Sequence, residues 1–69
     1  MPYVSIRITR EGGTTDDQRA ALIRGATELL REVLGKEPAT TFVVIDEVDL
    51  ENWGVAGLPV REHRRKLRR

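Results

Sequence analysis

A long helix between two strands is the feature of this sequence that most limits its fold. Thr15 and Gln18 form a capping box at the expected start of the helix, and the two aspartates between them suit the positive end of the helix dipole. The apolar residues that follow recur at steps of three and four, which is typical of an amphipathic helix. Gly35 is a suitable residue just after the helix, and Pro38 prevents it from continuing. The pattern predicts a helix of about 20 residues, roughly 30 Å long.

Strand-like segments flank this helix on both sides. Residues 3–9 alternate with a period of two, so that their β-branched apolar residues share one face. Residues 40–48 form the second expected strand, and the centre of this strand, residues 42–45, is apolar on both faces, as expected of a strand covered on both sides. A strand, a helix and a strand with short connections predict a βαβ unit with parallel strands and a right-handed crossover.

The remaining chain is too short to complete an ordinary sheet. Residues 53–60 mix glycines with apolar residues after a polar loop, which indicates a short hairpin or arm. A single βαβ unit leaves one sheet face and two edges uncovered, and the chain has no cysteine for disulfides. A chain of this size buries only about 60% of its unfolded surface. We therefore expect an α+β fold of one βαβ unit plus a C-terminal arm, completed by oligomerisation.

The charge divides the chain into a domain, residues 1–60, and a basic tail, residues 61–69. The domain carries six Lys or Arg against ten Asp or Glu, whereas the tail carries six against one. The tail has no apolar periodicity and is expected to be solvated or partly ordered, with a helical turn as a possibility. Its charge fits weak polyanion binding, but no aromatic residue or reading motif accompanies it, so nucleic acid is not the expected partner. No signal peptide or membrane span is expected, and we expect a cytoplasmic protein.

Pro2 is the candidate catalytic residue. Met1 is usually removed when the next residue is small, which would leave Pro2 as a free secondary amine at the end of a strand. A general base works best with a pKa near the operating pH, and an α-amino group starts near ~8. Apolar surroundings or a nearby guanidinium would lower that pKa. The alternative is a structural proline, because the first residue of a strand needs no ladder donor.

These segments together resemble the 4-oxalocrotonate tautomerase family. The resemblance rests on Pro2, on the Thr-Asp-Asp-Gln helix start at 15–18 and on Asn-Trp-Gly-Val-Ala-Gly at 52–57. It implies a tautomerase fold with the proline amine as base and without a metal or organic cofactor. It also implies a small enol or unsaturated keto acid substrate and a homo-oligomer, commonly a hexamer, with active sites near subunit boundaries.

The resemblance also assigns possible substrate contacts. Trp53 matches the aromatic wall that shields the amine, and the alternative is a core or interface tryptophan, which is the more common role of a lone Trp in a small domain. Two family arginines are missing. Gly13-Thr14, in a longer loop, and Phe42 stand in their places. Those arginines bind the two ends of a dicarboxylate in the parent activity. We therefore expect a substrate with one carboxylate or none and an aryl or aliphatic end, rather than 4-oxalocrotonate.

Two other arginines are candidates for substrate binding. Arg10 lies beside the altered loop and could clamp a carboxylate, or it could be an ordinary solvent-facing residue. Arg61 follows the arm and could reach an adjacent site in an oligomer, or form an ordinary exposed ion pair. The acidic residues at 46–51 are more typical of a solvated strand end than of a metal site. A catalytically silent assembly protein with the same fold is the remaining alternative.

Overall fold

The computed structural model describes residues 1–67 of the chain, and their fold is the predicted βαβ unit. Strands β1 (Tyr3–Thr9) and β2 (Phe42–Val48) are parallel and are joined by helix α1 (Asp16–Leu34). The register sets Tyr3 opposite Phe42 and Thr9 opposite Val48. The other elements are the 3-10 helices η1 (Pro38–Thr40) and η2 (Leu50–Asn52), strands β3 (Gly54–Val55) and β4 (Leu58–Pro59), and helix α2 (Val60–Leu67).

The predicted ends of α1 are confirmed. The Thr15 hydroxyl accepts a hydrogen bond from the backbone N–H of Gln18 at 3.1 Å, and the Gln18 side chain accepts one from the N–H of Thr15 at 2.9 Å. Gly35 adopts a left-handed conformation with φ 67°, and its N–H donates to the Arg31 carbonyl at 3.0 Å. Local interactions therefore determine where the helix begins and ends.

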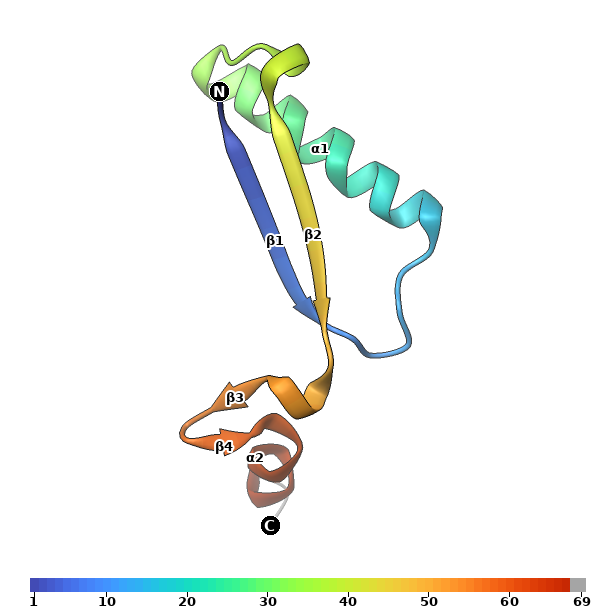
Figure 1. Ribbon diagram of the computed structural model, residues 1–69, viewed down its shortest axis with the longest axis vertical. Helices are drawn as coiled ribbons and strands as arrows, with labels where there is room; N and C mark the ends of the chain where they lie inside the picture. Colours follow the sequence, from blue (N-terminus) through green and yellow to red (C-terminus); the bar gives the residue numbers. More distant parts are fainter. Residues whose placement is uncertain (68–69) are drawn as a thin grey trace.

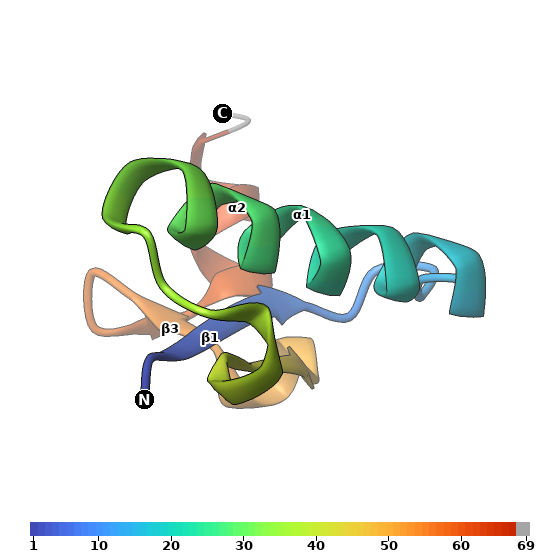
Figure 2. The same ribbon diagram turned by 90° about the horizontal axis from the view of Figure 1, so that it is seen from above.

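Within residues 1–67, one face of the two-stranded sheet is covered and the other is open. Helix α1 lies across that face (Figure 2), where the side chains of Val4, Ile6 and Ile45 are half-buried. Phe42 and Val44 are exposed on the opposite, open face. The expected cover on both sides of β2 is therefore absent from a single chain. The same face carries the exposed ion pair of Arg7 and Asp46. The uncovered apolar side chains on it support the prediction that copies of the chain complete the fold.

The arm and α2 lie beyond the carboxyl ends of β1 and β2 (Figure 1). The hairpin of β3 and β4 is antiparallel, as the glycine-rich segment indicated. Its two-residue turn, Ala56 and Gly57, has φ values of 55° and 80°, which is characteristic of a tight turn whose two central residues are both left-handed. The elements η2, β3, β4 and α2 form a small lobe, and Val60, only 7% exposed, is buried in it.

Two sequence predictions were wrong in detail. The second strand begins at Phe42 rather than residue 40, because Pro38 starts a 3-10 turn there. The tail, expected to be solvated or partly ordered with a possible helical turn, forms a longer helix that continues to Leu67, because Val60 is buried and Arg64 pairs with Glu11. The tail residues Arg68 and Arg69 lie outside the described part of the chain. Neither helix within residues 1–67 combines the length and the apolar character that a membrane span requires.

Candidate active site

Pro2 lies at the amino end of the sheet, next to the backbone of β2. Its carbonyl accepts a hydrogen bond from the N–H of Phe42 at 3.0 Å, which fixes the residue to the start of the ladder. Side chains alternate along a strand, so Pro2 shares the helix-covered side with Val4, whereas Phe42 shares the open face with Tyr3. The backbones of Pro2 and Phe42 are therefore neighbours, and their side chains lie on opposite faces.

The other predicted site residues lie at the carboxyl end of the sheet (Figure 1). Arg10 directly follows β1, and Trp53 and Arg61 belong to the lobe beyond β2. Strand β1 has seven residues, which at about 3.3 Å each separates the two ends by roughly 20 Å. Trp53 therefore cannot reach the Pro2 of its own subunit. Of the four predicted substrate-binding residues, Phe42 is the one that contacts Pro2 within residues 1–67.

Trp53 is held by backbone contacts at the base of the arm. Its N–H donates to the Leu50 carbonyl at 3.2 Å, closing η2, and its carbonyl accepts from the N–H of Val60 at 2.9 Å. The indole-bearing residue is thus anchored between η2 and the first residue of α2, and it is half-buried in this lobe. Trp53 directly precedes β3, the first strand of the projecting hairpin.

Arg10 and Arg61 differ in how firmly the chain holds them. Arg10 contacts the Glu47 carboxylate at 3.7 Å, the Glu47 carbonyl at 3.3 Å and Asp49 at 3.3 Å. Within residues 1–67, Arg61 forms one ion pair, with Glu51 at 3.5 Å, and both side chains of that pair are largely exposed. The guanidinium of Arg10 is therefore already compensated by two carboxylates, whereas that of Arg61 is held loosely.

Glu47 is the centre of a polar cluster that sequence reasoning missed. Its side chain is 15% exposed and accepts a hydrogen bond from the Thr14 hydroxyl, in addition to the Arg10 contact. Arg19 donates to the carbonyl and hydroxyl of Thr14 at 2.6 and 2.9 Å. The Thr14 hydrogen bond is the main cause that lowers the pKa of Glu47. This cluster joins the long loop to β2, and 33 residues separate Thr14 from Glu47 in sequence.

A second missed contact joins the same loop to α2. Both carboxylate oxygens of Glu11 accept hydrogen bonds from Arg64, at 2.6 and 3.2 Å. This pair, helped by the Thr9 hydroxyl, lowers the pKa of Glu11 to about 2. The two residues are 53 positions apart, and a local sequence pattern cannot indicate so distant a partner. The pair of Glu11 and Arg64 therefore could not be predicted from the sequence alone.

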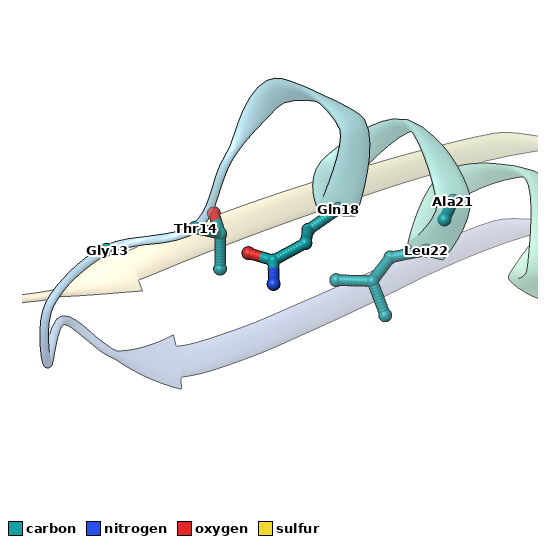
Figure 3. Close-up of a pocket in the computed structure, with 5 residues that line it drawn as sticks. All are labelled: Gly13, Thr14, Gln18, Ala21 and Leu22. Carbon is teal, nitrogen blue, oxygen red and sulfur yellow. The ribbon is translucent and has the colours of Figure 1, made fainter.

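A hollow of about 550 Å³ lies where the long loop meets the start of α1 (Figure 3). Thr14, Gln18 and Leu22 line it, together with Gly13 and Ala21. None of these five lining residues is charged. The loop position that carries an arginine in the resembled family is therefore neutral here, and the hollow offers apolar surface with one amide and one hydroxyl.

Comparisons with known proteins agree with this arrangement. Residues 2–63 match the family of tautomerase enzymes. The probable tautomerase K2 of Dickeya dadantii (strain 3937) is 53% identical over 66 residues, covering 96% of this chain and 97% of that protein. The 2-hydroxymuconate tautomerase of Pseudomonas putida is 37% identical over 62 residues, covering 90% and 95%.

A solved structure has the same fold. The crystal structure of DmpI from Helicobacter pylori superposes with a TM-score of 0.81 at 40% identity, covering 88% of this chain and 98% of that one. Sequence and fold thus agree over nearly the whole length of both chains. The chain belongs to the tautomerase family and is an isomerase of the 4-oxalocrotonate tautomerase type.

Proposed function

We propose that the Pro2 amine, exposed by removal of Met1, is the general base of a cofactor-independent keto–enol tautomerase. The observation that carries this proposal is the hydrogen bond from the Phe42 N–H to the Pro2 carbonyl. It fixes the backbone of Pro2 at the strand end and leaves the ring nitrogen outside the ladder. A secondary amine held this way can approach a substrate without a change in the sheet.

The reaction needs only proton transfer. The uncharged ring nitrogen takes the hydroxyl proton of the enol as the C–O bond becomes a carbonyl, and the carbon–carbon double bond takes a proton back from the resulting ammonium. The amine ends in its original state, so neither a metal nor a redox partner is required. An enclosure with apolar walls favours the uncharged amine, because burial disfavours the charged form.

The substrate class that fits best is a monocarboxylic enol with an aryl or aliphatic end, such as an aryl enolpyruvate. Two observations support this class. Phe42 occupies a position that carries an arginine in the family, and the hollow at Gly13 and Thr14 has no charged residue in its lining. Neither of these two positions itself carries the cation that would bind a second carboxylate. Apolar surface is available there instead.

Other copies of the chain complete the site in this proposal. Pro2 and Trp53 are roughly 20 Å apart along β1, so a neighbour must supply the aromatic wall. Tyr3, Phe42 and Val44 are exposed on the open face and would be covered in such an assembly. We propose a homo-oligomer, with a hexamer as the expected state. Size-exclusion chromatography with light scattering measures this directly.

The test of the catalytic role is the Pro2→Ala variant. Intact-mass measurement first establishes that the purified wild-type chain begins at Pro2. Ketonisation of phenylenolpyruvate is then followed by its loss of ultraviolet absorbance, and the variant is expected to lose this activity. An unchanged rate would refute the role of Pro2. An assembled but inactive wild-type protein would favour the silent assembly role instead.

A further inference from the structure

We propose that Arg61, and not Arg10, is the residue that binds the substrate carboxylate. The assignment rests on the proposed function, because it places Arg61 beside the Pro2 of a neighbouring copy. The assignment follows from the contacts that Arg10 and Arg61 already make and from the position of Trp53 near Arg61.

Arg10 is committed to the fold. Its guanidinium contacts two carboxylates and a carbonyl, and one of the carboxylates belongs to Glu47, whose side chain is only 15% exposed. A substrate that drew Arg10 away would leave the Glu47 carboxylate half-buried with fewer partners, which is costly. An incoming carboxylate would also meet the negative charges of Glu47 and Asp49 at this position. Arg10 therefore serves to hold the loop and strand ends together.

Arg61 has the opposite character. Its single ion pair, with Glu51, spans 3.5 Å, and the side chains are 62% and 65% exposed. Exposed pairs of this kind contribute little to stability, so a ligand carboxylate can replace Glu51 at small cost. A guanidinium can bind such a carboxylate through two parallel N–H donors. The charge of Arg61 is thus available for recognition.

The neighbour of Arg61 supplies a second kind of contact. Residue Val60, directly before it, is buried and donates its N–H to the Trp53 carbonyl at 2.9 Å. This bond fixes the backbone at Arg61 relative to the residue that bears the indole. A cation and a large aromatic ring on one rigid lobe match the two ends of an aryl or unsaturated carboxylate. The combination of Arg61 and Trp53 therefore fits the same substrate class that the uncharged loop at Gly13 and Thr14 and the apolar Phe42 indicate.

The other cations of this lobe within residues 1–67 are less suitable. Arg64 holds both oxygens of Glu11, a pair strong enough to lower the pKa of that carboxyl to about 2. Arg65 and Lys66 are exposed one helical turn or more beyond Arg61, farther along α2 from Trp53. Arg65 has the same charge as Arg61 and is also exposed, so it serves as the matched control.

The test compares Arg61→Ala, Arg10→Ala and Arg65→Ala in the assembled protein. Binding of cinnamate, a carboxylate, and of cinnamamide, its neutral analogue, is measured by calorimetry, which does not require turnover. Arg61→Ala is expected to weaken cinnamate binding about 10- to 100-fold, as for loss of a charged hydrogen-bond pair, with cinnamamide binding unchanged. The KM for phenylenolpyruvate is expected to rise in parallel. Arg65→Ala is expected to behave as wild type.

Each result separates this assignment from the proposed function. If Arg10→Ala causes the cinnamate-specific loss, or if Arg61→Ala weakens both ligands equally, the assignment to Arg61 is overturned. Arg10→Ala is expected instead to lower thermal stability and to leave the ratio of cinnamate to cinnamamide affinity unchanged. An active Pro2→Ala variant would remove the catalytic role of the proline without affecting the calorimetric comparison.

Discussion

Pro2 and Trp53 lie at opposite ends of the same two-stranded sheet, one before the first residue of β1 and the other beyond the last residue of β2. The parallel register forces this separation. Both strands run in one direction, so a residue before β1 and a residue after β2 cannot meet on one chain. A site that uses both residues must join two copies.

Complementation between two defective variants tests this sharing. Pro2→Ala and Trp53→Ala are each expected to be inactive or strongly impaired as homo-oligomers, the first without a base and the second without its aromatic wall. When the two proteins are unfolded together and refolded, mixed assemblies hold some sites with both residues intact. The ketonisation rate of the mixture is expected to exceed the summed rates of the separate variants. Equal rates would contradict a shared site.

The open sheet face is expected to be an interface between copies. Val44→Asp replaces an exposed apolar side chain of this face with a carboxylate, two residues from Asp46 on the same strand, and burying this added charge in an interface would be strongly unfavourable. The variant is expected to elute as a smaller species than wild type in size-exclusion chromatography. Arg24→Asp, at an exposed position of α1, is the matched control and is expected to keep the wild-type size. A wild-type elution volume for Val44→Asp would contradict the interface.

The pair between Glu11 and Arg64 is expected to make stability depend on pH in the acid range. The pKa of Glu11 falls from an ordinary 4.5 to about 2, so the pair stabilises the fold fully above pH 4.5. This stabilisation is lost as the pH falls through about 2, where the folded carboxyl takes up its proton. Urea denaturation of wild type and Glu11→Gln measures the effect. The variant is expected to be less stable at pH 7 and to differ little from wild type near pH 2.

Glu62→Gln is the control for the acid titration. Glu62 is exposed on α2, the helix that carries Arg64, and it takes part in none of the ion pairs found within residues 1–67. The free energy of unfolding of Glu62→Gln is expected to change with pH in the same way as that of wild type. If Glu11→Gln shows the same loss at pH 7 and near pH 2, the stabilisation does not come from the ionised pair.

The capping box is expected to contribute measurably to the stability of α1. Thr15→Ala removes the hydroxyl that accepts from the Gln18 N–H and is expected to lower the free energy of unfolding by about 1 kcal/mol. Thr15→Asn keeps a capping acceptor and is expected to lie close to wild type. Chemical denaturation monitored by circular dichroism distinguishes the two variants. Equal losses in both would assign the effect to something other than the cap.

The sequence predicts best the features that depend on nearby residues. Thr15, Gln18 and Gly35 define the helix ends through contacts within a few positions, and the structure confirms them. The arm was also predictable, because its turn needs residues that tolerate positive φ at Ala56 and Gly57. Strand alternation gave β1 its bounds directly. These signals are local, so they can be recognised in the sequence without knowing which distant residues make contact.

Features that depend on distant contacts could not be predicted. Helix α2 has only two apolar residues, Val60 and Leu67, and Val60, at its first residue, is buried among elements that precede it in the chain. The cluster around Glu47 depends on a loop 33 residues earlier, so its carboxylate resembled a solvated strand end. The catalytic candidate Pro2 could be named from its position, whereas the distance between it and Trp53 required the parallel register.

The uncovered sheet face and the length of β1 have a consequence for activity. In the proposed assembly, a single chain has the Pro2 amine without the aromatic wall that a second copy supplies. The turnover per chain is therefore expected to fall when the protein is diluted until the copies separate.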